Sequence, residues 1–151
     1  MRIRKAKVDD VKKIDELGRD VSEFSVSKDT VNFWPKKILR NCIQSKSGFL
    51  FVAEENEEIV GFIIINHNPT FKKAIIENIF ITPSHRNREI AKKLLKTAIE
   101  KLKSIKCEYV CALVDSQNEK AEKFYITNGL KKGKAFVWMD KILSKNFKRK
   151  D

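Results

Sequence analysis

A basic stretch at a strand-to-helix junction is the part of this sequence best suited to binding an anion. It runs from Arg86 to Lys92, after a β-branched segment that ends at Pro83 and before apolar residues at helical spacing. The first turn of a helix has unpaired backbone N–H groups and about half a positive charge, so it attracts phosphate. Arg88 and Lys92 add positive charge there, and Asn87 adds donors. An ordinary basic helix start has the same composition, so both interpretations stay open.

Glu89 is the residue in this stretch that opposes an anion site. Its carboxylate repels phosphate, and it stands where a turn that wraps a diphosphate closely would favour glycine. Because the donors in such a turn are backbone N–H groups, a glutamate whose side chain points outward weakens binding without abolishing it. The sequence therefore predicts an anion cradle of reduced affinity.

The periodicity of the sequence predicts one mixed α/β (α+β) domain over residues 1–151, with a basic tail at 144–151 that folds back or hangs free. The predicted elements are a strand at 3–6, helices at 8–20 and 35–43, a strand hairpin at 48–68 with its turn at 55–57, a strand at 73–83, a helix at 87–105, a strand at 108–114, a helix at 116–129 and a strand at 134–143. The N-terminal strands are expected to be antiparallel, and the unit from 73 to 114 to be a parallel pair with a crossover helix. Ligands bind beyond the carboxyl ends of such parallel strands, where the basic stretch begins.

The composition narrows the classes of function. A net charge of +12 suggests that the protein binds nucleic acid. However, the lysines are spread along the chain and interleaved with glutamates, so we favour solvated helix faces as the explanation of the charge. The surplus charge still suits an anionic ligand or an acidic partner. No apolar run approaches the ~20 residues that cross a bilayer, and the N-terminus lacks the apolar stretch of a signal peptide. We therefore expect a cytoplasmic protein without membrane contact.

The three cysteines do not indicate a metal site. Cys42, Cys107 and Cys111 are odd in number, lack C-x-x-C spacing and do not cluster with His67 or His85. Buried or strand-flanking thiols are the simpler interpretation.

Two motifs occur in order with a predicted strand between them. "ENIFITPSHRNREIAKKLL" resembles the acyl-CoA-binding motif Q/R-x-x-G-x-G/A of the GNAT superfamily of N-acetyltransferases, with Arg86 at its first position and Ala91 at its last. "DSQNEKAEKFYITNGLKK" resembles the second motif of that family, in which an asparagine precedes an A-x-x-F/L-Y-x-x-x-G-F helix. The matching residues are Asn118, Ala121, Phe124, Tyr125 and Gly129. The predicted order of elements also matches the family fold over essentially the whole chain, and Glu89 departs from the pattern at the first glycine.

The resemblance implies acetyl-CoA as co-substrate, no metal, and a set of binding residues. These are Ile79, Phe80, Ile81, Arg86, Asn87, Arg88, Glu89, Ile90, Ala91, Lys92, Asn118 and Tyr125. It assigns the backbone N–H of Ile79 to the thioester carbonyl, with the main chain of Ile79 and Ile81 exposed to the pantetheine arm by a bulge or by splayed strands. The motif position of Tyr125 implies that it is the general acid. The alternative is that Tyr125 only packs against Phe124 on the helix face.

Glu77 is the candidate general base. Strand alternation predicts that it shares a face with Ile75, Ile79 and Ile81, where an apolar surrounding raises the pKa of a carboxyl. An exposed glutamate is the alternative. "ENIFI" also resembles an E-D-hydrophobic segment of some polyamine and amino-sugar members of the family, with Asn78 in place of the aspartate.

The acceptor would bind near the irregular segment 21–34, through Phe24, Phe33 and Trp34. The chain after Gly129 is short, which predicts an open cleft or one completed by a partner chain, that is, a homodimer. An open cleft favours a protein or peptide amine, either an N-terminus or a lysine, over a polyamine or amino sugar. A non-catalytic CoA-binding regulatory module remains the alternative because of Glu89.

Overall fold

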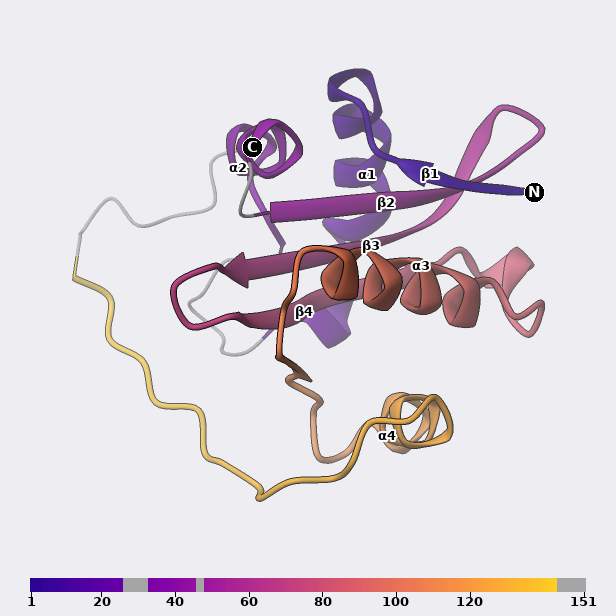
Figure 1. Ribbon diagram of the computed structural model, residues 1–151. Helices are drawn as coiled ribbons and strands as arrows, with labels where there is room; N and C mark the ends of the chain where they lie inside the picture. The colour runs from indigo at the N-terminus through magenta and orange to yellow at the C-terminus, as the bar shows by residue number, and fades with distance from the viewer. Residues whose placement is uncertain (26–32, 46–47, 144–151) are drawn as a thin grey trace.

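A five-stranded mixed sheet with helices on both faces forms the framework of the protein (Figure 1). The computed structural model describes residues 1–25, 33–45 and 48–143. The strands are β1 (Arg2–Lys5), β2 (Gly48–Glu55), β3 (Glu58–Asn68), β4 (Lys73–Ile81) and β5 (Tyr109–Ala112). The α-helices are α1 (Val11–Gly18), α2 (Lys36–Gln44), α3 (Ile90–Ser104) and α4 (Glu119–Thr127), and the 3-10 turns are η1 (Val8–Asp10), η2 (Ser22–Phe24) and η3 (Pro83–His85).

The strands lie in the order β1-β2-β3-β4-β5. The first three pairs are antiparallel and β4–β5 is parallel, with α3 as the crossover between them. The predicted mixed sheet, with antiparallel N-terminal strands and a parallel pair, is therefore confirmed. The predicted basic tail at 144–151 and the part of the acceptor segment at 26–32 lie outside the described residues.

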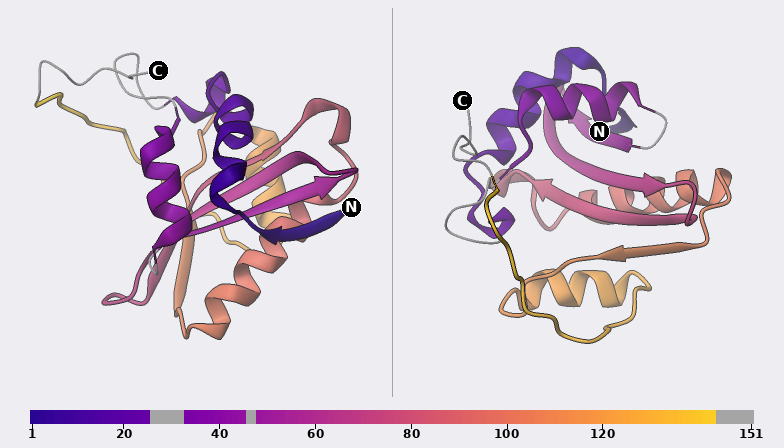
Figure 2. Two further views of the ribbon diagram at one scale, coloured as in Figure 1. Left: turned by 90° about the horizontal axis from the view of Figure 1, so that it is seen from above. Right: turned by 90° about the vertical axis from the view of Figure 1, so that its left-hand side faces the viewer.

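Helices cover both faces of the sheet (Figure 2), and strand alternation divides the buried side chains between these faces. On the face covered by α1 and α2, the buried side chains include Ile14, Leu39, Leu50, Phe62 and Ile64. On the face covered by α3 and α4, they include Ile63, Ile65, Leu94, Ala98 and Tyr125. Each large side chain buried in this way stabilises the fold by about 1.5–3 kcal/mol relative to an exposed one.

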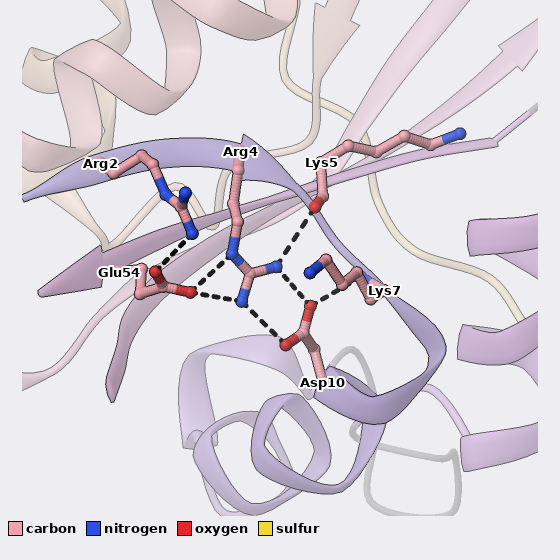
Figure 3. A network of polar contacts seen from close by, with 6 residues as sticks. All are labelled: Arg2, Arg4, Lys5, Lys7, Asp10 and Glu54. Carbon is pink, nitrogen blue, oxygen red and sulfur yellow. Dashed lines mark hydrogen bonds and ion pairs between the residues drawn. The ribbon is translucent and has the colours of Figure 1, made fainter. Parts of the chain in front are cut away.

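An arginine on β1 ties the first strand to its neighbours (Figure 3). The guanidinium of Arg4 lies 2.6 Å from Glu54 on β2 and 2.7 Å from Asp10 in η1. Arg2 adds a second contact of 2.7 Å to the other carboxylate oxygen of Glu54. Because β1 is an edge strand of only four residues, the part-buried charge-assisted contacts of Arg4 help to hold it in register.

The β2–β3 hairpin closes with two residues at positive φ, Asn56 (49°) and Glu57 (66°). A two-residue loop of this kind matches the twist of the strands that it joins, and asparagine tolerates the conformation well. The turn predicted at 55–57 is confirmed.

A β-bulge on β4 changes which face its side chains occupy. Ile64 pairs with Asn78 and Ile65 pairs with Ile76, so Glu77 is the extra residue. Ala74 and Ile76 before the bulge, and Ile79 and Ile81 after it, all belong to the core on the α3 side. Glu77 instead lies toward α2, where its charge affects the thiol of Cys42. The prediction that Glu77 shares a face with Ile79 and Ile81 was therefore wrong, because an inserted residue reverses the alternation.

The strand predicted at 134–143 is absent from the described part of the chain. After α4, Gly129 adopts a φ of +94° and the chain runs outside the sheet without joining it (Figure 1). An alternating sequence determines which side chains would share a face, but a strand also needs a backbone edge with which to pair. Within this chain the segment does not reach such an edge.

Candidate active site

The turn between β4 and α3 has the backbone of an anion cradle. Asn87 (φ 62°) and Glu89 (φ 56°) both adopt the left-handed conformation, so α3 begins at Ile90 and not at the predicted 87. The side chain of Glu89 is 67% exposed and its carboxylate lies 3.0 Å from Lys92. The hydrogen bond from Lys92 lowers the pKa of Glu89. The carboxylate thus points outward and is partly neutralised, which leaves the N–H groups at the start of the helix accessible.

The two arginines of the turn have different surroundings. Nε of Arg86 donates to the carbonyl oxygen of Ile81 at 3.2 Å, and its guanidinium lies 6.0 Å from the centre of the Phe80 ring. Arg88 instead donates from both terminal nitrogens to Glu55, at 2.9 and 2.8 Å. Arg86 therefore borders the cavity described next, whereas Arg88 does not line it and braces the turn from outside.

A cavity of about 1150 Å³ opens where β4 and β5 separate. Their parallel pairing ends with Ile76 opposite Ala112, while β4 continues along β3 to Ile81. The lining includes β4 from Ile75 to Ile81, the residues after β5, the start of α3 and the inner side of α4. Both expected features, a bulge and splayed strands, are present and expose the backbone of β4 to this cavity.

The cavity brings together almost all of the residues that the sequence analysis selected. Those that line it are Phe24, Phe33, Trp34, Glu77, Ile79, Phe80, Ile81, Arg86, Asn87, Glu89, Ile90, Ala91, Lys92, Asn118 and Tyr125. Arg88 is the exception among the predicted residues. Phe33 borders the cavity as a core residue, because only 3% of it is exposed and its ring packs against Phe62 at 5.6 Å.

The phenol of Tyr125 lies in an apolar part of the cavity. The residue is 8% exposed, and its ring meets that of Phe124 edge-on with the ring centres 5.2 Å apart. Burial raises the pKa of Tyr125 to about 12. The side chain is therefore a neutral O–H donor throughout the physiological range. The amide oxygen of Asn118 accepts from the backbone N–H of Ala121 at 3.0 Å and so caps the helix that presents Tyr125.

The carboxyl of Glu77 lies on the opposite face of β4 from Tyr125. Burial raises its pKa, and a hydrogen bond with the Asn66 side chain offsets this in part. Residues from both faces of the sheet line the cavity, because β5 has already separated from β4 at this point and leaves the edge of β4 open. Glu77 and Tyr125 therefore flank one space from its two sides.

The acceptor-side residues are joined to β4 by a hydrogen bond. Nε1 of Trp34 donates to Oδ1 of Asn78 at 2.7 Å, and the rings of Phe24 and Phe33 stack with their centres 5.7 Å apart. Asn78, at the position of the aspartate in the E-D-hydrophobic segment, thus holds a cavity-lining indole in place.

The comparison with protein families decides the identity. The model of the acetyltransferase (GNAT) family matches residues 16–129, which include β4, the cradle and α4. The chain belongs to the acetyltransferase (GNAT) family. The protein is thus an N-acetyltransferase whose co-substrate is acetyl-CoA. Among curated protein sequences, none matches the chain significantly.

Solved structures share the fold of this acetyltransferase. A PaiA N-acetyltransferase from Thermoplasma acidophilum, in complex with coenzyme A, is 24% identical with a TM-score of 0.75, over 86% of this chain and 89% of that chain. A transcriptional regulator from Bacillus halodurans is 22% identical with a TM-score of 0.75, over 92% and 98% of the two chains. An aminoglycoside acetyltransferase from an uncultured soil metagenomic sample, in complex with sisomicin, is 18% identical with a TM-score of 0.75, over 95% and 96%. At these identities the likeness establishes the common fold.

Several residues that line the cavity of the acetyltransferase escaped the sequence analysis. They include Glu23, Asn78, Leu113, Val114, Asp115, Asn128, Phe136, Val137 and Trp138. Asp115 follows the carboxyl end of β5, which is a signal that strand topology offers. Glu23 has no such signal, because the approach of η2 to the end of β4 is a tertiary contact.

In the part of the chain that the structure describes, there is no group of three or more His, Cys, Asp or Glu residues able to hold a metal ion, and no helix has the length and apolar character to cross a bilayer.

Proposed function

We propose that this acetyltransferase transfers the acetyl group of acetyl-CoA directly to a primary amine of a peptide or protein, an N-terminus or a lysine. One observation carries the proposal: Tyr125 and Glu77 flank the same cavity, and the cradle at the start of α3 also lines it. A donor site, a proton donor and a carboxyl of raised pKa thus share one space.

The cradle fits the diphosphate of coenzyme A. The N–H groups at the start of α3 are the donors, and Arg86 and Lys92 add positive charge at the cavity. The outward carboxylate of Glu89 is unfavourable in charge but does not fill the cradle. The exposed backbone of Ile79 and Ile81 would pair with the pantetheine arm.

Amine acetylation requires a neutral amine, a polarised carbonyl and a proton for the departing thiol. When bound, acetyl-CoA supplies the activated acetyl group as a thioester. In this proposal the carboxylate of Glu77 takes a proton from the acceptor ammonium, directly or through water. The backbone N–H of Ile79 donates to the carbonyl oxygen, and Oη of Tyr125 donates the proton to the sulfur. A raised pKa suits both side chains, since Glu77 becomes a stronger base and Tyr125 stays protonated.

The shape and charge of the protein favour a macromolecular acceptor. The chain after α4 forms no covering hairpin in the described residues, and the aromatic side of the cavity opens beside Trp34. A net charge of +12 repels polycations at a distance and attracts acidic peptides. Locally, the carboxylates of Glu23 and Glu77 lie on the lining and suit a single ammonium group.

The test is a release assay for free coenzyme A thiol with three acceptor panels: acidic and basic peptides with free N-termini or lysines, polyamines, and aminoglycosides. We expect turnover with peptides, higher with acidic ones, and its loss in Tyr125→Phe. Turnover confined to the small-amine panels would overturn the peptide assignment and leave the acyl-transfer chemistry intact.

A polyamine or amino sugar is the second candidate acceptor. The carboxylates at the aromatic side of the cavity support it, as does the presence of aminoglycoside acetyltransferases among the structural neighbours. Coenzyme A binding with no turnover in any panel would instead indicate a non-catalytic coenzyme A-binding module, the alternative that Glu89 raises.

A further inference from the structure

Glu77 and Asn78 are neighbours on β4 whose side chains lie on the same face of the sheet. In a regular strand, successive side chains point to opposite faces. Here the bulge inserts Glu77 between Ile76 and Asn78. Asn78 binds Trp34 on the α2 side of the sheet, and the charge of Glu77 acts on Cys42 of α2. The bulge therefore places a carboxyl and an amide side by side on the lining of the cavity.

The indole of Trp34 determines how the amide of Asn78 is oriented. Because Nε1 of an indole can only donate, the atom that it binds at 2.7 Å is the amide oxygen. Nδ2 of Asn78 keeps its N–H donors, and no acceptor for them lies among the described residues. Since Asn78 is half-buried and lines the cavity, a bound molecule can accept from Nδ2. Asn78 thus offers donors to the cavity, whereas an ionised Glu77 offers acceptors.

We propose that Glu77 and Asn78, here called the β4 fork, recognise an α-amine together with the carbonyl group of the same residue, so that the acceptor is a peptide N-terminus and not a lysine side chain. This inference rests on the proposed function. The carboxylate of Glu77 accepts from the ammonium group, and Nδ2 of Asn78 donates to the carbonyl oxygen. The Cα atoms of adjacent residues are about 3.8 Å apart, so their side chains can reach two groups that a single carbon separates. In lysine the whole side chain separates the amine from the nearest carbonyl.

The acid–base chemistry of Glu77 favours the same acceptor. An α-amino group has an ordinary pKa of about 7.7–8.0, against about 10.4 for lysine. Burial raises the pKa of Glu77 and brings it closer to that of the α-amine, which makes proton transfer to the carboxylate less unfavourable. An amine without a neighbouring carbonyl, as in a polyamine, would also leave the donors of Asn78 without a partner.

Two matched probes test the β4 fork in the full-length protein. Leucinamide and isoamylamine have the same branched side chain and a primary amine, and only leucinamide has a carbonyl beside the amine. We would measure kcat/KM with acetyl-CoA, and affinity by titration calorimetry in the presence of coenzyme A. We expect leucinamide to bind more tightly by about tenfold, as for a site that hydrogen-bonds one ligand and leaves its donors unpaired with the other.

Three variants separate the fork from general effects on the cavity. Asn78→Asp keeps an oxygen for Trp34 but replaces the donors by a carboxylate, so the leucinamide-to-isoamylamine ratio should fall by about tenfold or more in both measurements. Trp34→Phe keeps a ring but lets the amide turn, and should lower the ratio by a smaller factor. Glu23→Gln lines the same cavity and should keep the native ratio, because both probes have the same ammonium group. Native coenzyme A affinity shows that each variant is folded.

The outcomes distinguish the fork from the chemistry that it serves. If Asn78→Asp keeps the native ratio while both probes are acetylated, the fork is overturned and the acyl transfer stands. If neither probe is acetylated, the proposed function fails, and the affinities alone decide: equal affinities, or no binding of either probe, overturn the fork. With peptides that have a free N-terminus and an internal lysine, mass spectrometry should locate the acetyl group at the N-terminus. Acetylation confined to the lysine would overturn the assignment.

Discussion

Both terminal nitrogens of Arg88 donate to the carboxylate of Glu55, and this pair ties the cradle to the end of β2. Nε2 of His85 lies 3.4 Å from the same carboxylate. Two residues of the turn, Asn87 and Glu89, have left-handed backbone conformations, which residues other than glycine adopt less often. Contacts from outside the turn are therefore needed to keep it in place. We therefore expect Glu55 to affect acetyl-CoA binding through Arg88, as a positioning residue.

Replacing Glu55 by glutamine should weaken coenzyme A binding by roughly two- to fivefold, because an exposed ion pair contributes little energy but here orders a strained turn. Titration calorimetry measures the change. Glu58→Gln, an exposed carboxylate at the start of β3, is the control and should bind as the native protein does. Equal losses in the two variants would point to net charge and not to positioning.

Replacing Glu89 by glycine should tighten coenzyme A binding by on the order of 5–10-fold, because it removes a carboxylate near the diphosphate and relieves a φ of +56°. Glu89→Gln separates the two effects, since it removes the charge and keeps the backbone conformation strained. We expect an intermediate affinity for glutamine, and a rise in Tm of roughly 2–4 °C for glycine alone. No detectable binding by any of the three proteins would contradict the cradle.

Tyr125→Phe should lower kcat by roughly 10²–10⁴-fold, because it removes the proton donor but keeps the packing against Phe124. Coenzyme A affinity should change little. Because the pKa of Tyr125 is about 12, its hydroxyl stays protonated in alkaline solution. The activity of the native protein should therefore not fall through ionisation of Tyr125 as the pH is raised to about 10. If the Tyr125→Phe variant keeps the native kcat, Tyr125 is not the proton donor and serves only in packing.

Glu77→Gln should lower kcat/KM and remove the acid limb of its pH profile. Because burial raises the pKa of Glu77, the native limb should lie above the ordinary range for a glutamic acid. The matched control is Glu23→Gln, which lines the same cavity but has a lowered pKa. An unchanged limb in Glu77→Gln would assign the base to another group or to water.

The same substitution should change stability with a definite sign. The raised pKa means that folding favours the protonated form of Glu77, so the favourable contribution is fully present below the unfolded-state pKa and is lost as the pH rises through the folded-state pKa. The Tm difference between Glu77→Gln and the native protein should thus be near zero at pH 4 and become positive by pH 7. Differential scanning calorimetry at the two pH values measures it, and a difference independent of pH would contradict the burial of this carboxyl.

Local sequence determined the cradle and the residues around it. The basic turn, the apolar stripe of α3 and the positions of Asn118 and Tyr125 on α4 depend on spacing within one element or one turn, where the helical repeat determines the geometry. Nearly every residue selected from the two motifs lines a single cavity, although the motifs are about thirty residues apart and only the tertiary structure brings them together.

Tertiary structure decided which face Glu77 occupies, where β4 and β5 separate, and whether the segment 134–143 forms a strand. A bulge depends on the register between β3 and β4, which no pattern within β4 reveals. The outward role of Arg88 depends on Glu55, thirty-three residues earlier in the chain. A strand likewise forms only where a backbone edge is within reach, because its hydrogen bonds lie between segments, unlike those of a helix.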